Sequence, residues 1–165
     1  MVIRRLTPSD DIDHVSRVYA RSWKTAYQGI VPQEYLDSLP ENRWSPFLAE
    51  DPSQLWLACE GEEIIGASTY GPTRDGAMPG WGEIVSIYLL PEFYRRGIGS
   101  KLFKASLESL VSMGYSDVYL WVLEDNHPAR RFYEKNGFQC NGDALCDTIG
   151  GKELREIRYI LHLGK

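Results

Sequence analysis

The chain of 165 residues is poor in the residues that build metal centres and disulfide frameworks. It has three histidines, and its three cysteines, Cys59, Cys140 and Cys146, form no CxxC pair and no set with metal-ligand spacing. An odd number of scattered cysteines is typical of reduced thiols in a reducing compartment. These absences predict a cytoplasmic protein with no metal site.

Long apolar runs and an excess of basic residues are also missing. No stretch of about 18 apolar residues is available to cross a membrane, and the start, MVIRRLTPSDD, lacks the apolar core of a signal peptide. Lysine and arginine total 18 against 23 aspartates and glutamates, a net charge of −5. Without a basic face that would displace counterions, we expect neither a nucleic acid nor a membrane as a partner. The acidic balance favours a cationic small molecule.

What the sequence does contain fits a single domain over residues 1–165. Apolar residues make up 43% of the chain and aromatic residues 12%, enough for one sizeable core. The order in which predicted strands and helices follow one another predicts an α/β fold. In this fold, helices pack on one central, mixed, seven-stranded sheet. The patterns predict strands at 2–6, 54–59, 63–70, 83–90, 117–123, 138–146 and 154–163, and about four helices, near 12–28, 33–39, 98–113 and 126–136, with a further short one over 41–50 left open.

Residues 94–100, YRRGIGS, form a glycine-rich turn between a predicted strand and a predicted helix. Gly97 and Gly99 carry no Cβ, so a ligand can approach the backbone closely. The amides of this turn open a helix, where an anion is favoured. Arg95 and Arg96 add positive charge for phosphate oxygens. The turn therefore predicts a pyrophosphate site.

A Gly-x-Gly turn alone is a weak signal. The chain has no GxxxxGK[ST] loop, and GxGxxG fails because Leu102 stands where the third glycine belongs. On these residues alone, a tight strand-to-helix turn with solvated arginines remains the alternative.

Two motifs make the chain resemble the GNAT superfamily of N-acetyltransferases over nearly its whole length. The family's pyrophosphate motif, Gln/Arg-x-x-Gly-x-Gly/Ala, matches residues 94–99 except that Tyr94 occupies the first position. The second motif, Asn-x-x-Ala-x-x-x-Tyr-x-x-x-Gly-Phe, is complete at residues 126–138. Residues 22–32 are similar to a bacterial subgroup whose substrates are poorly defined. The resemblance implies a single-domain GNAT fold and acetyl-CoA as the cosubstrate.

The resemblance also implies how acetyl-CoA would be held. The pyrophosphate would sit on the amides of residues 95–100, and the pantetheine arm would pair like an extra strand with Ile87 and Leu89. A cleft for the arm opens where this strand splays from its neighbour after Val118. An amide near Leu89 would polarise the thioester carbonyl. The residues implied in cosubstrate binding are Ile87, Tyr88, Leu89, Tyr94, Arg95, Arg96, Gly97, Ile98, Gly99, Ser100, Asn126, Ala129 and Phe132.

Tyr133 matches the general acid of the family. A CoA thiolate has a conjugate pKa of about 8.5 and a phenol a pKa of about 10, so a neutral tyrosine is able to donate to the departing thiolate. The alternative is a tyrosine that only packs its helix on the sheet. Asn126 likewise has two interpretations, a contact with the pantetheine amides or a plain helix N-cap.

Glu83 is the candidate base. An alkylammonium has a pKa of about 10.4 and must lose a proton before it attacks a carbonyl. Glu83 lies in an apolar strand, where a carboxylate is costly unless it is hydrogen-bonded or functional. Its distance from Gly97 matches that of the base glutamate in the histone acetyltransferase branch. Direct action, action through water and a solvated strand-start glutamate all stay open.

Trp23 and Tyr27 are the candidate acceptor contacts, and Trp44 would complete an aromatic wall for a cation. Residues four apart on a helix also often just pack together. The favoured function is transfer of an acetyl group to a primary amine of a small molecule, by direct attack in a ternary complex. The alternatives are a protein or peptide N-acetyltransferase and a non-catalytic acyl-CoA sensor. Because many relatives dimerise, a homodimer stays open.

Overall fold

The computed structural model describes residues 1–164 and contains one seven-stranded sheet in the order β1-β2-β3-β4-β5-β7-β6. The strands are β1 (Val2–Arg5), β2 (Leu55–Glu60), β3 (Glu63–Pro72), β4 (Gly82–Leu89), β5 (Asp117–Leu123), β6 (Gln139–Ile149) and β7 (Lys152–His162). The α-helices are α1 (Ile12–Ala26), α2 (Gln33–Ser38), α3 (Ser45–Glu50), α4 (Ile98–Ser112) and α5 (His127–Lys135). Among these residues no helix is both long and apolar enough to span a bilayer.

The predicted element order is observed, with differences at the ends of elements. The short helix left open over 41–50 is present as α3, which brings the α-helices to five. β3 runs on to Pro72 because Pro72 still pairs with Gly82 of β4. β6 runs on to Ile149 because its ladder with β7 continues to the pair of Ile149 and Lys152. In each case a partner strand prolongs the element beyond what local pattern predicts.

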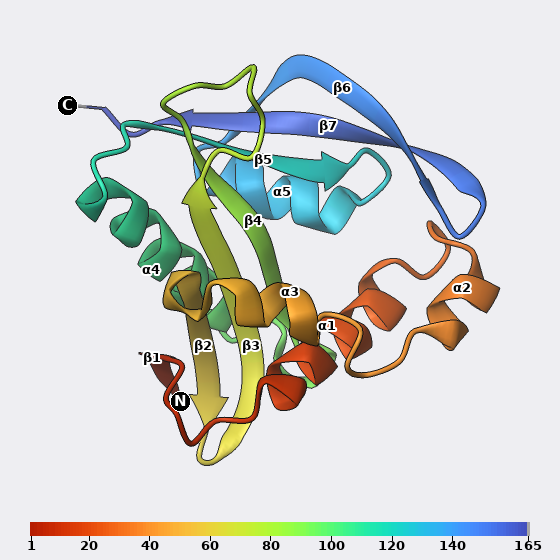
Figure 1. Cartoon of the computed structure of the whole chain (residues 1–165). Coiled ribbons are helices and arrows are strands. Elements are labelled where there is room, and N and C mark those ends of the chain that lie inside the picture. Colours follow the sequence, from red (N-terminus) through yellow and green to blue (C-terminus); the bar gives the residue numbers. More distant parts are fainter. Residues whose placement is uncertain (165) are drawn as a thin grey trace.

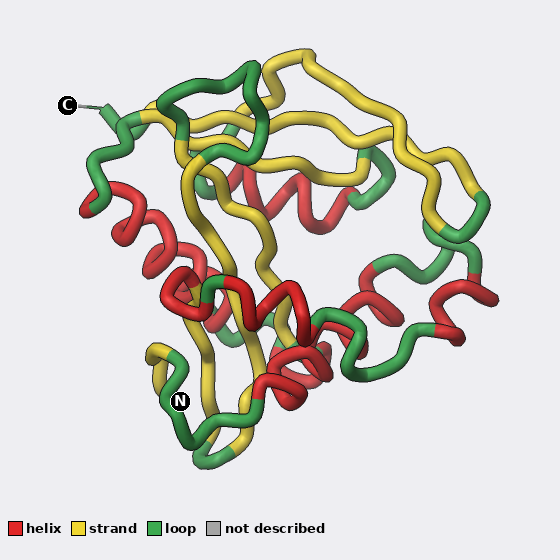
Figure 2. The backbone as a smooth tube through the Cα atoms, in the orientation of Figure 1, coloured by secondary structure: helices red, strands yellow, loops and turns green. Residues whose placement is uncertain are grey.

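Helices cover both faces of the sheet (Figures 1 and 2). On one side, which we call the α1 face, Tyr19 of α1 shares a 2.6 Å hydrogen bond with Ser86 of β4. On the other, the α4 face, Ser106 of α4 donates to Ser68 of β3 at 2.8 Å. α5 shares with α4 the apolar cluster around Phe103, so it lies on the α4 face as well. Alternate side chains of a strand point to opposite faces, which separates the two sets of contacts.

The central feature of the sheet is a gap between β4 and β5. These parallel strands pair only where Gly82 meets Val118 and Glu83 meets Tyr119. The register between β3 and β4 shifts beside Val85, which is therefore the extra residue of a β-bulge. Figure 1 shows β2, β3 and β4 diverging from the layer of β5, β6 and β7 beyond this point. The strands thus splay as predicted, one residue later than Val118.

Candidate active site

The turn that precedes α4 presents a row of free backbone amides. Tyr94 donates to Pro91 at 3.1 Å, and Lys101 is the next residue with an amide bonded inside the chain, to Gly97 at 3.2 Å. Within residues 1–164, the amides of residues 95–100 have no hydrogen-bond acceptor. Gly97 has a φ of 77°, which L side chains rarely adopt. Six free donors at the N-terminus of a fifteen-residue helix form a setting that fits an anion.

The side chains of residues 94–96, beside that row of donors, are exposed. Tyr94 is 43% exposed, and Arg95 and Arg96 are exposed as well. The Arg96 guanidinium lies 5.1 Å from the centre of the Phe93 ring. Both arginines therefore stay accessible to an anion bound at the amides.

α5 lies directly beside the turn and joins the second sequence motif to the first. A Cβ built on Gly99 would lie 3.7 Å from Cε1 of Phe132. Asn126 caps α5, because its Oδ1 accepts from the amide of Ala129 at 3.4 Å. The N-cap interpretation of Asn126 therefore holds, and its Nδ2 donates to no group among residues 1–164.

Tyr133 of α5 is half-buried and packs against aromatic rings of the α4 face. Its ring centre lies 5.7 Å from Phe103 and 6.4 Å from Tyr159. Burial raises the pKa of Tyr133 above its usual value, and the nearby Tyr88 adds to this shift. The hydroxyl has no hydrogen-bond partner among residues 1–164, whereas the Tyr159 hydroxyl is held by Arg130 and Glu134. Tyr133 is thus a neutral donor whose hydrogen bond is not used within the described chain.

The edge of β4 next to the splay places Ile87, Tyr88 and Leu89 between the turn and α5. All three are half-buried, and β5 gives them no strand partner. The Leu89 carbonyl accepts from Ser22 Oγ of α1 at 3.1 Å. The backbone along this edge is therefore open to pairing by an extended ligand.

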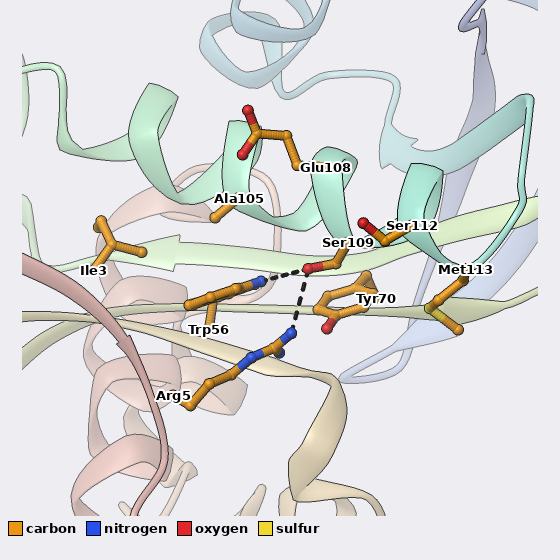
Figure 3. A pocket seen from close by; sticks show the side chains of 9 residues that line it. All are labelled: Ile3, Arg5, Trp56, Tyr70, Ala105, Glu108, Ser109, Ser112 and Met113. Carbon is orange, nitrogen blue, oxygen red and sulfur yellow. Dashed lines mark hydrogen bonds between the residues drawn. The ribbon is translucent and has the colours of Figure 1, made fainter.

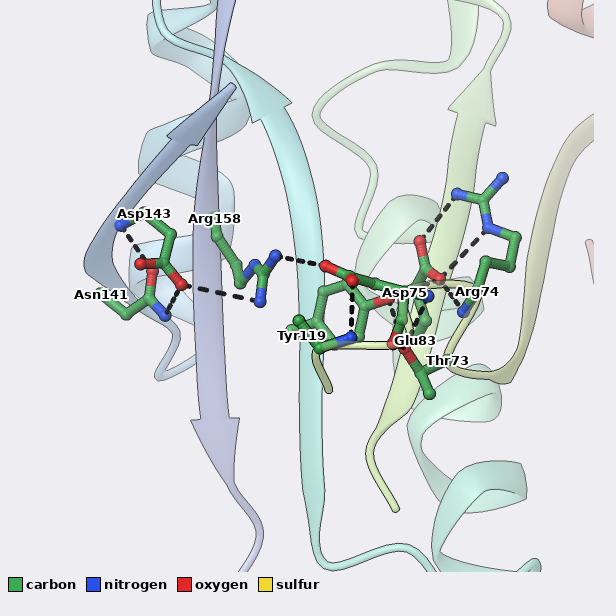
Figure 4. Close-up of polar contacts among 9 residues, drawn as sticks. Thr73, Arg74, Asp75, Glu83, Tyr119, Asn141, Asp143 and Arg158 are labelled. Atoms are coloured by element: carbon green, nitrogen blue, oxygen red, sulfur yellow. Dashed lines mark hydrogen bonds and ion pairs between the residues drawn. The ribbon is translucent and has the colours of Figure 1, made fainter. Parts of the chain in front are cut away.

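Glu83 is buried and fully engaged (Figure 4). Its side chain is 2% exposed. Oε1 accepts from the backbone amide and Nε of Arg74, at 3.1 and 3.2 Å, and from the Tyr119 hydroxyl at 2.9 Å. Oε2 accepts from Arg74 Nη2 at 2.7 Å. The interpretation of Glu83 as a solvated strand-start residue is therefore wrong.

The loop of residues 73–81, which carries Arg74, is tied across the α1 face to the last hairpin (Figure 4). Arg158 of β7 donates to Asp75 of the loop at 2.7 Å and lies 3.6 Å from Asp143 of β6. Its guanidinium stacks 4.4 Å from the Trp121 ring, and its side chain is 7% exposed. A buried cation between two carboxylates holds the loop near Glu83.

The tip of the β6–β7 hairpin is held against the segment that links α1 and α2. Gly150 has a φ of 60°, and a Cβ there would lie 2.6 Å from Cβ of Tyr35 in α2. Lys152 Nζ donates to the Ile30 carbonyl at 3.1 Å. The α1 face beside the splay is therefore bordered by α1 and α2, by the hairpin and by the 73–81 loop.

Trp23, Tyr27 and Trp44 do come together, largely by packing on one another. Trp23 lies 4.6 Å from Tyr27 and 5.3 Å from Trp44 between ring centres. The Tyr27 hydroxyl shares a 3.0 Å hydrogen bond with that of Tyr88 on β4. Burial raises the pKa of Tyr27 above its usual value. The three rings therefore form one cluster, and its contact with an acceptor stays a prediction.

Sequence reasoning missed Arg74, Tyr119 and Arg158, which surround Glu83 or hold its loop. Alternation along β5 was the available signal for Tyr119, because it puts Tyr119 and Trp121 on one face. Nothing in the sequence pattern pairs Asp75 with Arg158, which are 83 positions apart.

A pocket of about 510 Å³ between β1 and the C-terminal half of α4 is separate from these residues (Figure 3). Two donors that line it are bonded within the pocket, since Trp56 Nε1 and Arg5 Nη2 both donate to Ser109 Oγ, at 2.9 and 3.3 Å. Among residues 1–164, no three His, Cys, Asp or Glu side chains gather in a group that would hold a metal ion.

Comparison with known proteins identifies the family to which the fold described above belongs. A model of the acetyltransferase (GNAT) family matches residues 16–138. An uncharacterized N-acetyltransferase of Bacillus subtilis, YuaI, is 33% identical over 98% of this chain and 99% of its own length. A spermidine N(1)-acetyltransferase of Thermoplasma acidophilum is 25% identical over 95% and 96% of the two chains. The crystal structure of the PaiA N-acetyltransferase of Thermoplasma acidophilum with coenzyme A has a TM-score of 0.76 at 23% identity, covering 98% of each chain.

Proposed function

The chain belongs to the GNAT family of acetyltransferases, and we propose that it moves the acetyl group of acetyl-CoA to a primary amine of a small molecule. Transfer takes place by direct attack within a ternary complex. One observation carries the proposal: six free amides at the start of α4 open onto the splay between β4 and β5, with Tyr133 beside it. This arrangement fits a pyrophosphate followed by an extended arm that ends at a thioester.

Each part of acetyl-CoA has a counterpart in this chain. The pyrophosphate binds the amides of residues 95–100, with Arg95 and Arg96 near its oxygens. The pantetheine arm pairs with the open edge of β4 at Ile87 and Leu89, and Asn126 Nδ2 donates to one of its amides. Phe132 and Ala129 line the arm from the α5 side. The coenzyme A in the structure of the Thermoplasma acidophilum relative is consistent with this assignment.

The reaction needs a nucleophile, an oxyanion contact and an acid. The neutral amine nitrogen attacks the thioester carbon, and the carbonyl oxygen gains negative charge near the amide of Leu89. The C–S bond then breaks, and the thiolate takes a proton from the Tyr133 hydroxyl. The acetylated nitrogen loses its extra proton to solvent, and the Tyr133 phenolate takes a proton from solvent and becomes neutral again. The products are the N-acetyl amine and the free thiol of CoA.

Glu83 is the proposed base, and its geometry favours an indirect route. Arg74 and Tyr119 occupy both carboxylate oxygens, and the side chain is buried. The ammonium proton therefore reaches Glu83 through water, or after the half-exposed Arg74 side chain moves aside. Tyr119 and Arg74 act as positioning residues that keep the carboxylate pointed toward the α1 face.

A small acceptor fits the borders of the α1 face better than a peptide. The hairpin tip contacts α2 and the segment before it, and the ion pairs of Arg158 join the 73–81 loop to the hairpin. These contacts close the ends of the α1 face at the hairpin tip and at the 73–81 loop, where an extended peptide would have to pass. The name of the spermidine acetyltransferase relative gives independent support for a small cationic acceptor.

Release of CoA thiol from acetyl-CoA tests the proposal against a panel of polyamines, aminoglycosides, amino acids and short peptides. We expect release that depends on a small amine and a product that is heavier by one acetyl group in mass spectrometry. Release with peptides alone would replace the small acceptor by a protein. Acetyl-CoA binding without release for any acceptor would indicate a sensor instead of the proposed enzyme.

A further inference from the structure

Glu156 occupies the middle of the bordered α1 face, beside the residues described above. It lies on β7, where it pairs in register with Leu123 of β5 and Leu145 of β6. Side chains two positions away on a strand share its face, so Leu154 and Arg158 lie on either side of it. Leu154 belongs to the apolar cluster under the α1–α2 segment, and Arg158 holds the 73–81 loop. Glu156 therefore lies between the apolar cluster that contains Leu154 and the ion pairs of Arg158.

The charge of Glu156 has no partner among residues 1–164. No hydrogen bond or ion pair reaches its carboxylate, although the side chain is half-buried. The two arginines near it on this face already have carboxylate partners. Arg158 forms ion pairs with Asp75 and Asp143, and Arg74 forms one with Glu83. Lone carboxylates are rarely left half-buried in this way, because burial disfavours the charged form.

The surroundings of Glu156 connect it with the proposed chemistry. Burial raises the pKa of Glu156, the charge of Asp147 raises it further, and Arg74 lowers it. Burial is the main cause of the raised pKa of Tyr27, and Tyr133 and Glu156 both raise it further, so Tyr27 lies within electrostatic reach of the proposed acid and of Glu156. A cation next to Glu156 would therefore lie on the acceptor side of the splay, next to an aromatic side chain.

We propose that Glu156 is a specificity-determining residue that binds an ammonium group of the acceptor. This inference rests on the proposed function and adds the group that selects a cation over a neutral or acidic acceptor. An ammonium supplies the missing counter-charge and three hydrogen-bond donors. Glu83 is unsuited to this part because Arg74 already neutralises it. Acceptors with a carboxylate near the amine are disfavoured by the same charge.

Direct binding of a diamine separates this inference from acetyl transfer. Calorimetric titration of 1,4-diaminobutane into the CoA-saturated protein would compare wild type, Glu156→Gln and Glu153→Gln. Glu153 is an exposed residue of the same strand on the opposite face, so its variant removes the same charge elsewhere. We expect Glu156→Gln to weaken binding about 10- to 100-fold, with Glu153→Gln within twofold of wild type. The melting temperature of Glu156→Gln should equal or exceed that of wild type.

A third variant, Glu156→Asp, keeps the charge and guards against a purely structural effect. It should bind the diamine more tightly than Glu156→Gln. Equal weakening in both variants, or Glu156→Gln binding within twofold of wild type, would overturn the inference, as would a wild-type protein that binds no diamine.

The thiol-release assay, run on the same proteins, shows which proposal fails. Wild type that binds the diamine through Glu156 and releases no CoA would leave Glu156 standing and remove the transfer proposal. Transfer to the diamine at the wild-type kcat/KM by Glu156→Gln would keep the transfer proposal and remove Glu156.

Discussion

The two sides of the β4–β5 splay differ in the groups that they present: backbone amides on one side and side chains on the other. On the cosubstrate side, the contacts proposed for acetyl-CoA are backbone amides at the start of α4 and the open edge of β4, with α5 packed alongside. On the acceptor side, which is the α1 face beside the splay, the surface is made of side chains from α1, β4, β5, β7 and the 73–81 loop, joined by ion pairs and hydrogen bonds between elements.

This difference explains why the cosubstrate side can be predicted from a sequence and the acceptor side cannot. A row of amides needs only a turn with the right glycines, so a short motif encodes it. A network of charged side chains depends on which distant segments meet, and each member can be exchanged if its partner changes as well. We therefore expect substitutions on the two sides to separate binding of acetyl-CoA from use of the acceptor.

The largest effect should come from Tyr133→Phe, which removes the acid and keeps the ring. We expect kcat to fall by about 100-fold or more, with the Kd for acetyl-CoA and the melting temperature near their wild-type values. Tyr115→Phe, at the far end of α4, is the matched control and should be active. Because the pKa of Tyr133 is raised, this residue should cause no loss of kcat up to pH 10. Full activity in Tyr133→Phe would contradict the acid role.

A smaller effect should follow from Glu83→Gln, on the acceptor side. The variant loses the proton acceptor and its ion pair with Arg74, so kcat/KM for the amine should fall about 10- to 100-fold. Initial rates across pH would measure it, beside Glu108→Gln, an exposed glutamate of α4. A pH profile with the same shape and height as that of wild type would remove Glu83 from the mechanism.

On the cosubstrate side, Gly97→Ala should weaken acetyl-CoA binding and leave kcat at saturation near wild type. A φ of 77° disfavours alanine by roughly 1–2 kcal/mol. The free turn of the variant should relax away from this conformation and must regain it on binding, which raises the Kd about tenfold. Gly61→Ala offers a matched control, since Gly61 has a φ of 60° in the β2–β3 turn and open space around it. Calorimetric titration with acetyl-CoA would measure both. Equal affinity of both variants for acetyl-CoA would contradict a role of the 94–100 turn in binding it.

The smallest effect on activity should come from Asp10→Asn, which lies outside both sides. Two hydrogen bonds from Arg4, at 2.7 and 2.9 Å, hold the pKa of Asp10 below its usual range. A lowered pKa in the folded state adds stability above the unfolded pKa of about 3.9, and this stability is lost as the pH falls further. The variant should therefore melt about 2–4 °C below wild type at pH 7. The gap should narrow in acid, with kcat/KM unchanged; a gap that persists in strong acid would contradict the ion-pair account.

Local pattern predicted the fold because the strands and helices carry clear periodicity and the two motifs lie at their junctions. The turn at 94–100 and the cap at Asn126 were found from spacing alone. The three Arg74 donors to Glu83 were not, because the conformation of a loop without periodicity decides where Arg74 points. Glu156 gave no signal either, since its missing partner is visible only once the neighbouring charges are paired in three dimensions.

Initial velocities measured with both substrates varied distinguish direct acetyl transfer from transfer through an acetylated enzyme. Acetyl-CoA and the best amine would be varied together, with CoA thiol release as the readout. Direct attack in a ternary complex predicts double-reciprocal lines that intersect, and release that requires the amine. Parallel lines, which indicate an acetylated enzyme intermediate, or release independent of any amine would contradict the account.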